Sequence, residues 1–226
     1  MPNYVYNTVR FSYKDMDKVK SLLGDGFDFN RIIPMPESLN IVAGSVTSDA
    51  EAFLAGKVEE LTKRYPEGGE KPKPEYFYGC KQSPKNMAEL EVFADIIKCN
   101  KFLYGHTDWY GWCNAKWDTK WNASSVCWDS NSVYFETAWC SPERVFVELS
   151  KKLGITFRVE CEEESLAFCS ITEYSDGQIV DRQIEEGVAG LVLLGYTLDD
   201  VLERYDGWVS EEELKEVEEE YRRAIS

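Results

Sequence analysis

The order of apolar and polar residues near the start of the chain predicts one strand followed by one helix. From Tyr4 to Ser12, side chains of two unlike kinds alternate, as is typical of a strand whose two faces meet different surroundings. Apolar residues then recur at helical spacing from Met16 to Leu23, and Gly24 supplies a residue that commonly ends a helix. This pattern predicts a β-α unit.

A second group of elements is predicted in the later half of the chain. A hairpin is expected from Ser125–Cys127 and Ser132–Ala138. The next helix is expected to begin with Ser141 as its N-cap and Pro142 at its first position, and to end at Gly154. Further strands are predicted over residues 155–161, 167–173 and 178–182. The order β-α, inserted helices, β-β-α-β predicts an α+β fold with the split βαβ arrangement of ferredoxin-like domains, extended by edge strands.

The segment between these two groups is predicted to be helical. Apolar residues at helical spacing indicate helices over 49–65 and 86–103, and a polar loop rich in Gly and Pro separates them over 66–74. We therefore expect a ferredoxin-like α+β domain over residues 1–183 that contains a helical insertion at about 49–105.

The last part of the chain, residues 184–226, is predicted to be an acidic helical extension. Thr197 is expected to cap one helix, and Ser210 with Glu213 to form the capping box of another. The extension is expected either to pack on the open face of the sheet or to reach a partner.

Charge is distributed unevenly along the chain. The formal net charge is −16, and residues 155–226 hold 6 Lys and Arg against 20 Asp and Glu. Because nucleic-acid affinity comes largely from cations that neutralise phosphates, duplex DNA is not expected to bind this part of the chain.

Composition also bears on the cellular setting. No segment has the pattern of an export signal or the length of a bilayer-spanning helix. The seven cysteines are scattered and form no C-x-x-C pair, which is typical of a reducing compartment. We therefore expect a soluble cytoplasmic protein, without disulfides and without a membrane partner.

Four stretches of the sequence, taken together, resemble one known family. They read P-N-Y-V-Y-N at 2–7, F-D-F-N-R-I-I-P-M-P at 27–36, K-W-D-T-K-W-N-A at 116–123 and F-E-T-A-W-C-S-P at 135–142. They resemble the ferredoxin-like domain family of unknown function found in bacteriophages, plasmids and integrated elements, typified by the YubB-like proteins. The resemblance covers about residues 1–183; it implies a mobile-element origin and a cytoplasmic host setting, and brings no established activity or catalytic residues.

The chain departs from that family in three places. Tyr4 stands where the family usually has Trp, and Asp118 stands where it usually has Gly. Cys140, Ser141 and Pro142 follow a tryptophan where the family has S-P-P. The loss of a glycine at position 118 implies a different backbone or side-chain role there.

Six of the seven tryptophans lie between Trp109 and Trp139. One interpretation is that most of them form the core between sheet and helices, since each buries a large apolar area. The alternative is a stacking site for single-stranded nucleic acid, because exposed aromatic residues on a ferredoxin-like sheet hold bases in RRM domains. The candidate stacking residues are Trp109, Trp112, Trp117 and Trp121.

Carboxylates interleaved with the tryptophans suggest a third function, a carbohydrate-active enzyme with a Trp-lined cleft. The residues in question are Asp108, Asp118, Asp129 and Glu136. His106 lies midway between Cys99 and Cys113, but structural zinc sites usually contain closer ligand pairs. No nucleotide-binding motif is present. The leading hypothesis therefore includes no catalytic residue, no metal and no cofactor.

Glutamates form the candidate binding surface of the leading hypothesis. A concentrated negative field can steer a basic protein to its site, although a solvated helix surface is the simpler explanation of most such runs. We hypothesise a non-enzymatic protein of bacteriophage or mobile-element origin that docks onto a basic host or phage protein. The docked protein would handle nucleic acid or act in defence, for example as a CRISPR-type protein, and binding would inhibit it. The candidate contact residues are Glu160, Glu162, Glu163, Glu164, Glu211, Glu212, Glu213, Glu216, Glu218, Glu219 and Glu220. The oligomeric state is not predicted.

Overall fold

The computed structural model describes residues 3–226 and contains two compact units. The first, here the sheet unit, comprises Met1–Ile33 and Trp117–Ser226; the second, the inserted unit, comprises Pro34–Lys116. The insertion is thus longer at both ends than the predicted 49–105. The reason is packing, because Ile41 lies in the core of the inserted unit and Asn100 donates a hydrogen bond to the Ser38 carbonyl.

The sheet unit contains an antiparallel sheet of six strands in the order β2-β3-β1-β4-β5-β6. The strands are β1 Tyr4–Phe11, β2 Ser124–Trp128, β3 Ser132–Ala138, β4 Thr156–Glu163, β5 Cys169–Ser175 and β6 Gln178–Glu185. Strand β3 lies between β1 and β2, and β1 lies between β3 and β4. These are the two interlocked split βαβ units of a ferredoxin-like fold, so the predicted α+β class is confirmed.

Nine α-helices are found within residues 3–226. Those of the sheet unit are α1 Met16–Leu23, α6 Glu143–Leu153, α7 Gly187–Leu193, α8 Leu198–Tyr205 and α9 Glu211–Ala224. Those of the inserted unit are α2 Ser45–Leu54, α3 Val58–Leu61, α4 Met87–Tyr104 and α5 Trp109–Lys116. The single helix predicted over 49–65 is wrong: α2 and α3 are separate because the chain turns at Gly56, whose φ is +78°. No helix in the described part of the chain is both long and apolar enough to cross a bilayer.

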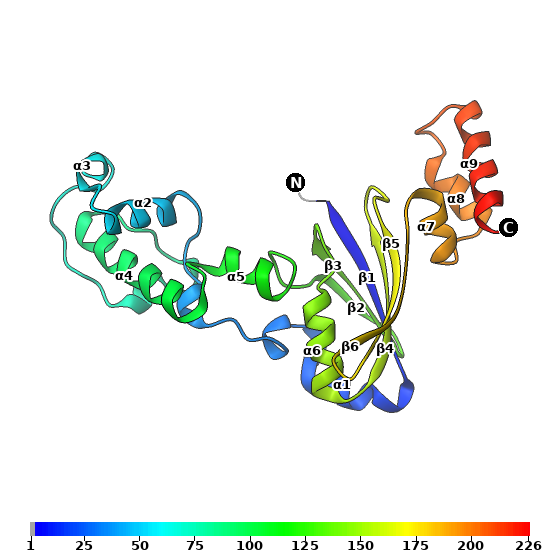
Figure 1. Ribbon diagram of the computed structural model, residues 1–226, viewed down its shortest axis with the longest axis horizontal. Helices are drawn as coiled ribbons and strands as arrows, with labels where there is room; N and C mark the ends of the chain where they lie inside the picture. The colour runs from blue at the N-terminus through cyan, green and yellow to red at the C-terminus, as the bar shows by residue number, and fades with distance from the viewer. Residues whose placement is uncertain (1–2) are drawn as a thin grey trace. The chain divides into compact units, whose positions relative to one another are not determined.

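The two faces of the sheet have different roles. Helices α1 and α6 cover one face (Figure 1), where Phe146 of α6 packs against Phe135 and Phe157 of the sheet. Buried Val5 and Val9 of β1 line the same side. The opposite face, here the open face, carries the intervening residues of β1, β3 and β4, which include Tyr6, Tyr134 and Glu160.

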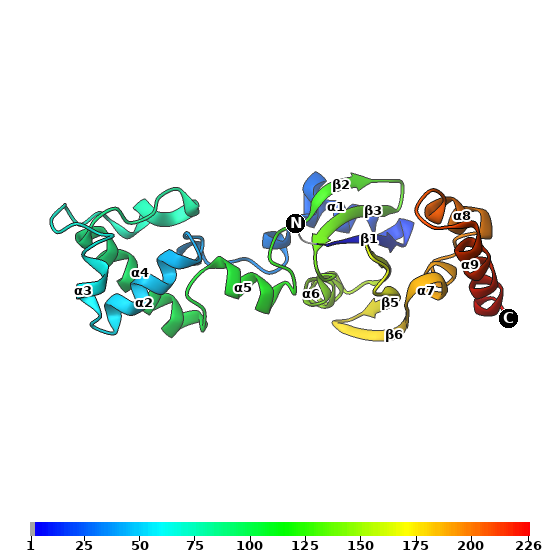
Figure 2. The ribbon, with the colours of Figure 1, turned by 90° about the horizontal axis from the view of Figure 1, so that it is seen from above.

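The C-terminal extension packs onto one end of the sheet unit. Helices α7, α8 and α9 lie together beyond the ends of the strands in both views (Figures 1 and 2). Their shared core consists of Leu166, Cys169, Val188, Leu191 and Val201, with Val217 and Tyr221 of α9 packed against it. The predicted caps at Thr197 and Ser210 are confirmed, each as a reciprocal capping box.

The start of α6 differs from its prediction. Ser141 does not cap the helix, because its hydroxyl donates a hydrogen bond to Asn7 Oδ1 at 2.7 Å. Asp118 acts there instead: its carboxylate accepts from the Arg144 backbone N–H at 2.8 Å and forms an ion pair with the Arg144 guanidinium. Asp118 has a φ of +63°, in the left-handed region that favours glycine. The side chain at position 118 therefore supplies a helix cap, at a position that requires a strained backbone.

Candidate functional site

The register of the central strands sets the layout of the open face. On β1, Tyr6 lies between Glu136 of β3 and Glu162 of β4. Two residues further along β1, Thr8 lies between Tyr134 and Glu160. Directly opposite residues in a sheet lie on the same face and in contact range. The strands therefore gather aromatic and charged side chains into adjacent rows.

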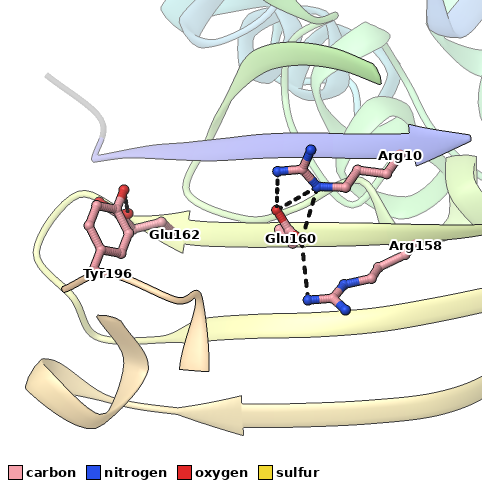
Figure 3. A network of polar contacts seen from close by, with 5 residues as sticks. All are labelled: Arg10, Arg158, Glu160, Glu162 and Tyr196. Carbon is pink, nitrogen blue, oxygen red and sulfur yellow. Dashed lines mark hydrogen bonds and ion pairs between the residues drawn. The ribbon is translucent and has the colours of Figure 1, made fainter. Parts of the chain in front are cut away.

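Glu160 is held by two arginines of the open face. Its carboxylate accepts three hydrogen bonds from the Arg10 guanidinium at 2.9 to 3.1 Å and pairs with Arg158 at 3.2 Å (Figure 3). The Arg10 and Arg158 side chains remain about half exposed, at 52% and 48%. Glu160 is thus neutralised within the fold, with one arginine in excess.

Glu162 joins the sheet to the C-terminal helices. It is buried, and its carboxylate pairs with Arg204 of α8 at 2.6 Å. The same carboxylate accepts a hydrogen bond from the Tyr196 hydroxyl at 2.9 Å (Figure 3). Burial, together with the hydrogen bond to Glu162, raises the pKa of Tyr196 to about 12. Glu162 is therefore part of the structure that holds α7 and α8 in place.

Glu163 and Glu164 bind the chain near the end of β4. Buried Glu163 accepts hydrogen bonds from Asn3 Nδ2, Ser165 N, Ser165 Oγ and Ala167 N at 2.5 to 3.1 Å. Burial alone would raise the pKa of Glu163, but the bonds from Ser165, Asn3 and Ala167 together lower it below its ordinary value. The exposed Glu164 carboxylate accepts from Tyr4 N at 3.0 Å.

The predicted docking surface is therefore corrected for β4. Glu160, Glu162 and Glu163 do not form an exposed anionic patch, because each carboxylate is neutralised or hydrogen-bonded by neighbouring residues. A charged side chain in a central strand needs such partners, since its burial would otherwise be strongly unfavourable.

A cleft of about 630 Å³ lies over these rows of the open face. Tyr6, Thr8, Tyr134 and the Arg10–Glu160 pair line its floor, and Leu194, Gly195 and Tyr196 line the end formed by the C-terminal helices. Of these residues, sequence reasoning selected only the glutamates. The alternation of Tyr4, Tyr6, Thr8 and Arg10 along β1 was the available signal, but only the strand register shows what lies beside them.

The glutamates of α9 have different surroundings. Glu212, Glu216 and Glu219 are exposed and recur at i, i+4 and i+7, so they share one face of the helix, here the α9 stripe. Val217 and Tyr221, on another side, pack into the core of the extension. Glu211 and Glu220 are exposed as well, Glu213 belongs to the capping box, and Glu218 pairs with Arg222. Within residues 3–226, no ion pair involves the three stripe residues.

The four candidate stacking tryptophans do not share a surface. Trp109 and Trp112 lie in the inserted unit, whereas Trp117 and Trp121 lie in the sheet unit. Trp112 and Trp117 are buried; the Trp117 indole N–H donates to the Ile33 carbonyl at 2.9 Å, and its ring packs edge-on against Phe29. Trp121 is 45% exposed beside the Lys120 ammonium.

The carboxylates proposed for a catalytic cleft are likewise separated. Asp108 lies in the inserted unit, where Thr47, Thr107 and the Tyr110 N–H donate to it. The other three, Asp118, Asp129 and Glu136, lie in the sheet unit. Asp118 is committed to the α6 cap, and of this set Glu136 alone lies in the rows of the open face.

Metal sites and reactive thiols each have requirements with which the described residues can be compared. No group of three His, Cys, Asp or Glu side chains is arranged there to hold a metal ion. Each of the seven cysteines is a free thiol. Burial raises the pKa of Cys161 to about 11 and that of Cys113 to about 12, so both remain protonated near neutral pH.

Comparison with known proteins identifies part of the sheet unit. Residues 116–206 match the family described as the ferredoxin-like domain in Api92-like protein. The match includes β2 to β6 and helices α6 to α8. It therefore extends beyond residue 183, where the family resemblance was expected to end, and it ends before α9. A crystal structure of the protein api92 from Yersinia pseudotuberculosis is similar with a TM-score of 0.42 and 11% identity, over 83% of this chain and 99% of that chain. No curated protein matches the sequence.

Proposed function

We propose that this chain is a non-enzymatic protein-binding protein that docks onto a basic partner through the α9 stripe. The observation that carries the proposal is that Glu212, Glu216 and Glu219 share one exposed helix face and form no ion pair within residues 3–226, with Lys215 and Arg223 as the cations of the same face. Their Cα atoms are spaced by about 4.5 to 6 Å along the helix axis. A row of anions at such spacing suits a protein whose own ligand is a phosphate backbone.

The setting of the proposal comes from the family resemblance. We place the protein in the cytoplasm of a bacterial host, as the product of a bacteriophage or another mobile element of the YubB-like kind. Its partner is then a host or phage protein that handles nucleic acid, including defence proteins of the CRISPR type, and binding inhibits it. The net charge of the sheet unit agrees with this assignment, since that unit holds 15 Lys and Arg against 29 Asp and Glu.

Two other functions receive less support. Single-stranded nucleic-acid binding by the four tryptophans would need one surface, and they are divided between two units, with two of them buried. A carbohydrate-active enzyme would need two converging carboxylates, and the candidates have separate structural environments.

The test is a capture experiment with the tagged full chain and host lysate. The stripe variant carries Glu212→Gln, Glu216→Gln and Glu219→Gln. The matched control carries Glu59→Gln, Glu60→Gln and Glu67→Gln, three exposed carboxylates of the inserted unit, so both variants change net charge equally.

We expect wild type and control to retain a basic protein that high salt releases and that the stripe variant fails to retain, because exposed charge pairs are screened by salt. Retention of the same partner by the stripe variant, or a partner that is acidic or indifferent to salt, would reject docking through α9.

A further inference from the structure

Among the three carboxylates of the central rows, Glu136, Glu160 and Glu162, one forms no ion pair with the described residues. Glu160 and Glu162 each pair with arginine. Glu136 does not; its two oxygens accept hydrogen bonds from the Tyr134 hydroxyl at 3.2 Å and from Ser125 Oγ at 2.9 Å. These hydrogen bonds give each carboxylate oxygen of Glu136 a donor, but the hydroxyl groups carry no charge that would neutralise the carboxylate.

Two tyrosine rings lie beside this carboxylate. Tyr6 is directly opposite Glu136, and Tyr134 is the diagonal neighbour of Tyr6 across β1 and β3. The ring centroids are 6.4 Å apart and the ring planes differ by 22°. Both rings line the cleft of about 630 Å³. Glu136 does not line the cleft itself but accepts the hydrogen bond of Tyr134, which does. These three side chains are here called the tyrosine corner.

Three carboxylates and one arginine, Arg204, act on the Tyr6 ring of the tyrosine corner. Burial is the largest cause that raises the pKa of Tyr6, and Glu164, Glu136 and Glu162 raise it further. Burial also raises the pKa of Tyr134, with Glu136 as the next cause. The same carboxylates would repel a phosphate, even though a stacked tyrosine pair on a ferredoxin-like sheet is a geometry that also suits nucleobases.

We propose that the tyrosine corner binds the side chain of a lysine or arginine that the basic partner supplies. A cation gains from the faces of aromatic rings and from a hydrogen-bonding carboxylate at the same position. The cleft is larger than one side chain, so the neighbouring residues of the partner fit beside it. The inference rests on the proposed function, because it takes the partner to be a basic protein.

The experiment is an NMR titration of the full chain labelled with ¹³C in its tyrosine rings. The probe is the peptide acetyl-Gly-Arg-Gly-amide, and its citrulline analogue keeps the shape without the charge. Tyr6→Phe and Tyr134→Phe assign the two ring signals. We expect the arginine peptide to shift both signals, and the citrulline peptide to bind at least about tenfold more weakly.

Substitutions distinguish specific binding at the tyrosine corner from a general effect of the protein's negative charge. Glu136→Gln removes the charge and keeps one acceptor oxygen for the Tyr134 or the Ser125 hydroxyl, while the amide NH2 group can donate to the other hydroxyl. We expect this change to weaken binding of the arginine peptide about tenfold. The matched control is Glu173→Gln, an exposed carboxylate on β5, which should leave the affinity unchanged. An unaltered amide spectrum verifies that each variant is folded.

Three outcomes would overturn the inference: equal binding of the citrulline peptide, no effect of Glu136→Gln, or ring shifts caused by oligothymidylate and not by the arginine peptide. The last outcome assigns the corner to single-stranded nucleic acid. The stripe variant distinguishes the two proposals, because it should lose the captured partner and still bind the peptide. If the wild-type chain captures the partner but its tyrosine signals do not respond to the peptide, the proposal for the tyrosine corner is rejected and docking through α9 is not.

Discussion

The glutamates of β4 and those of α9 are similar runs in the sequence and have opposite surroundings in the fold. Glu162 and Glu163 are 6% and 4% exposed, and every oxygen of theirs meets an arginine, a hydroxyl or an N–H group. Glu212, Glu216 and Glu219 face solvent. Charge counted along a sequence therefore measures how many carboxylates a chain has, and the fold determines which of them a partner can reach.

The cause of the difference is the neighbourhood of each element. Strand β4 lies between β1 and β5, and α8 extends over its end, so its carboxylates are removed from water and need internal partners. Helix α9 packs through Val217 and Tyr221 and leaves the opposite side open. Substitution of the β4 glutamates should therefore lower the free energy of unfolding more than substitution of the α9 glutamates.

The largest effect is expected for Glu163→Ala. The change removes the charged acceptor of several partly buried hydrogen bonds from Asn3, Ser165 and Ala167, which should lower the free energy of unfolding by about 3 kcal/mol. Chemical denaturation measures this, with Glu216→Ala of the stripe as control, expected within about 0.5 kcal/mol of wild type. Equal effects of the two substitutions would contradict the comparison.

A smaller loss, about 2 kcal/mol, is expected for Glu162→Ala. Tyr196 and Arg204 lose their shared acceptor, but the Arg204 side chain is 33% exposed and regains water. Amide hydrogen exchange in α8 should accelerate more than exchange in α6. Glu203→Ala, at an exposed position of the same helix, is the control and should leave both rates unchanged.

Glu160→Ala should lower the free energy of unfolding by about 1 kcal/mol, because its arginine partners are half exposed and such pairs contribute little. The loss should shrink at high salt. A double-mutant cycle with Arg10→Ala isolates the pair. A loss that does not depend on salt would indicate packing instead of charge.

The pH dependence of stability provides a further test at Glu163. Because its folded pKa lies below the ordinary value of 4.5, its contribution is complete above that value and is lost as pH falls through the folded pKa. Glu163→Gln should therefore flatten the decline of the unfolding free energy in acid. Denaturation of both proteins at a series of pH values measures the two slopes, and identical slopes would show that Glu163 does not contribute.

The smallest effect on stability is expected for the stripe variant. Neutralising Glu212, Glu216 and Glu219 removes repulsion on a solvated surface, so the free energy of unfolding should change by no more than about 0.5 kcal/mol. If this variant also fails to bind the partner, the failure results from the changed surface and not from unfolding. A large destabilisation would instead assign these residues a structural role.

Local signals account for the elements that were predicted well. The alternation in β1, the glycine after α6 and the capping boxes at Thr197 and Ser210 act over a few residues, so the sequence displays them directly. The prediction of Ser141 as a cap was wrong because contacts between distant parts of the sequence decide which side chain caps α6. The competing partners, Asn7 for Ser141 and the Arg144 N–H for Asp118, are distant in the sequence.

The sequence by itself determined the order of strands and helices in the sheet unit, the ferredoxin-like α+β class and the acidic character of the extension, because these follow from periodicity, caps and composition. Only the tertiary structure decided which glutamates are available, which tryptophans are buried and that Tyr6, Tyr134 and Glu136 meet. The physical reason is that a carboxylate or an aromatic ring acquires its energy and its role from neighbours that strand register and helix packing bring beside it. Tyr6 and Glu136, for example, are more than a hundred residues apart in the chain and lie directly opposite each other in the sheet.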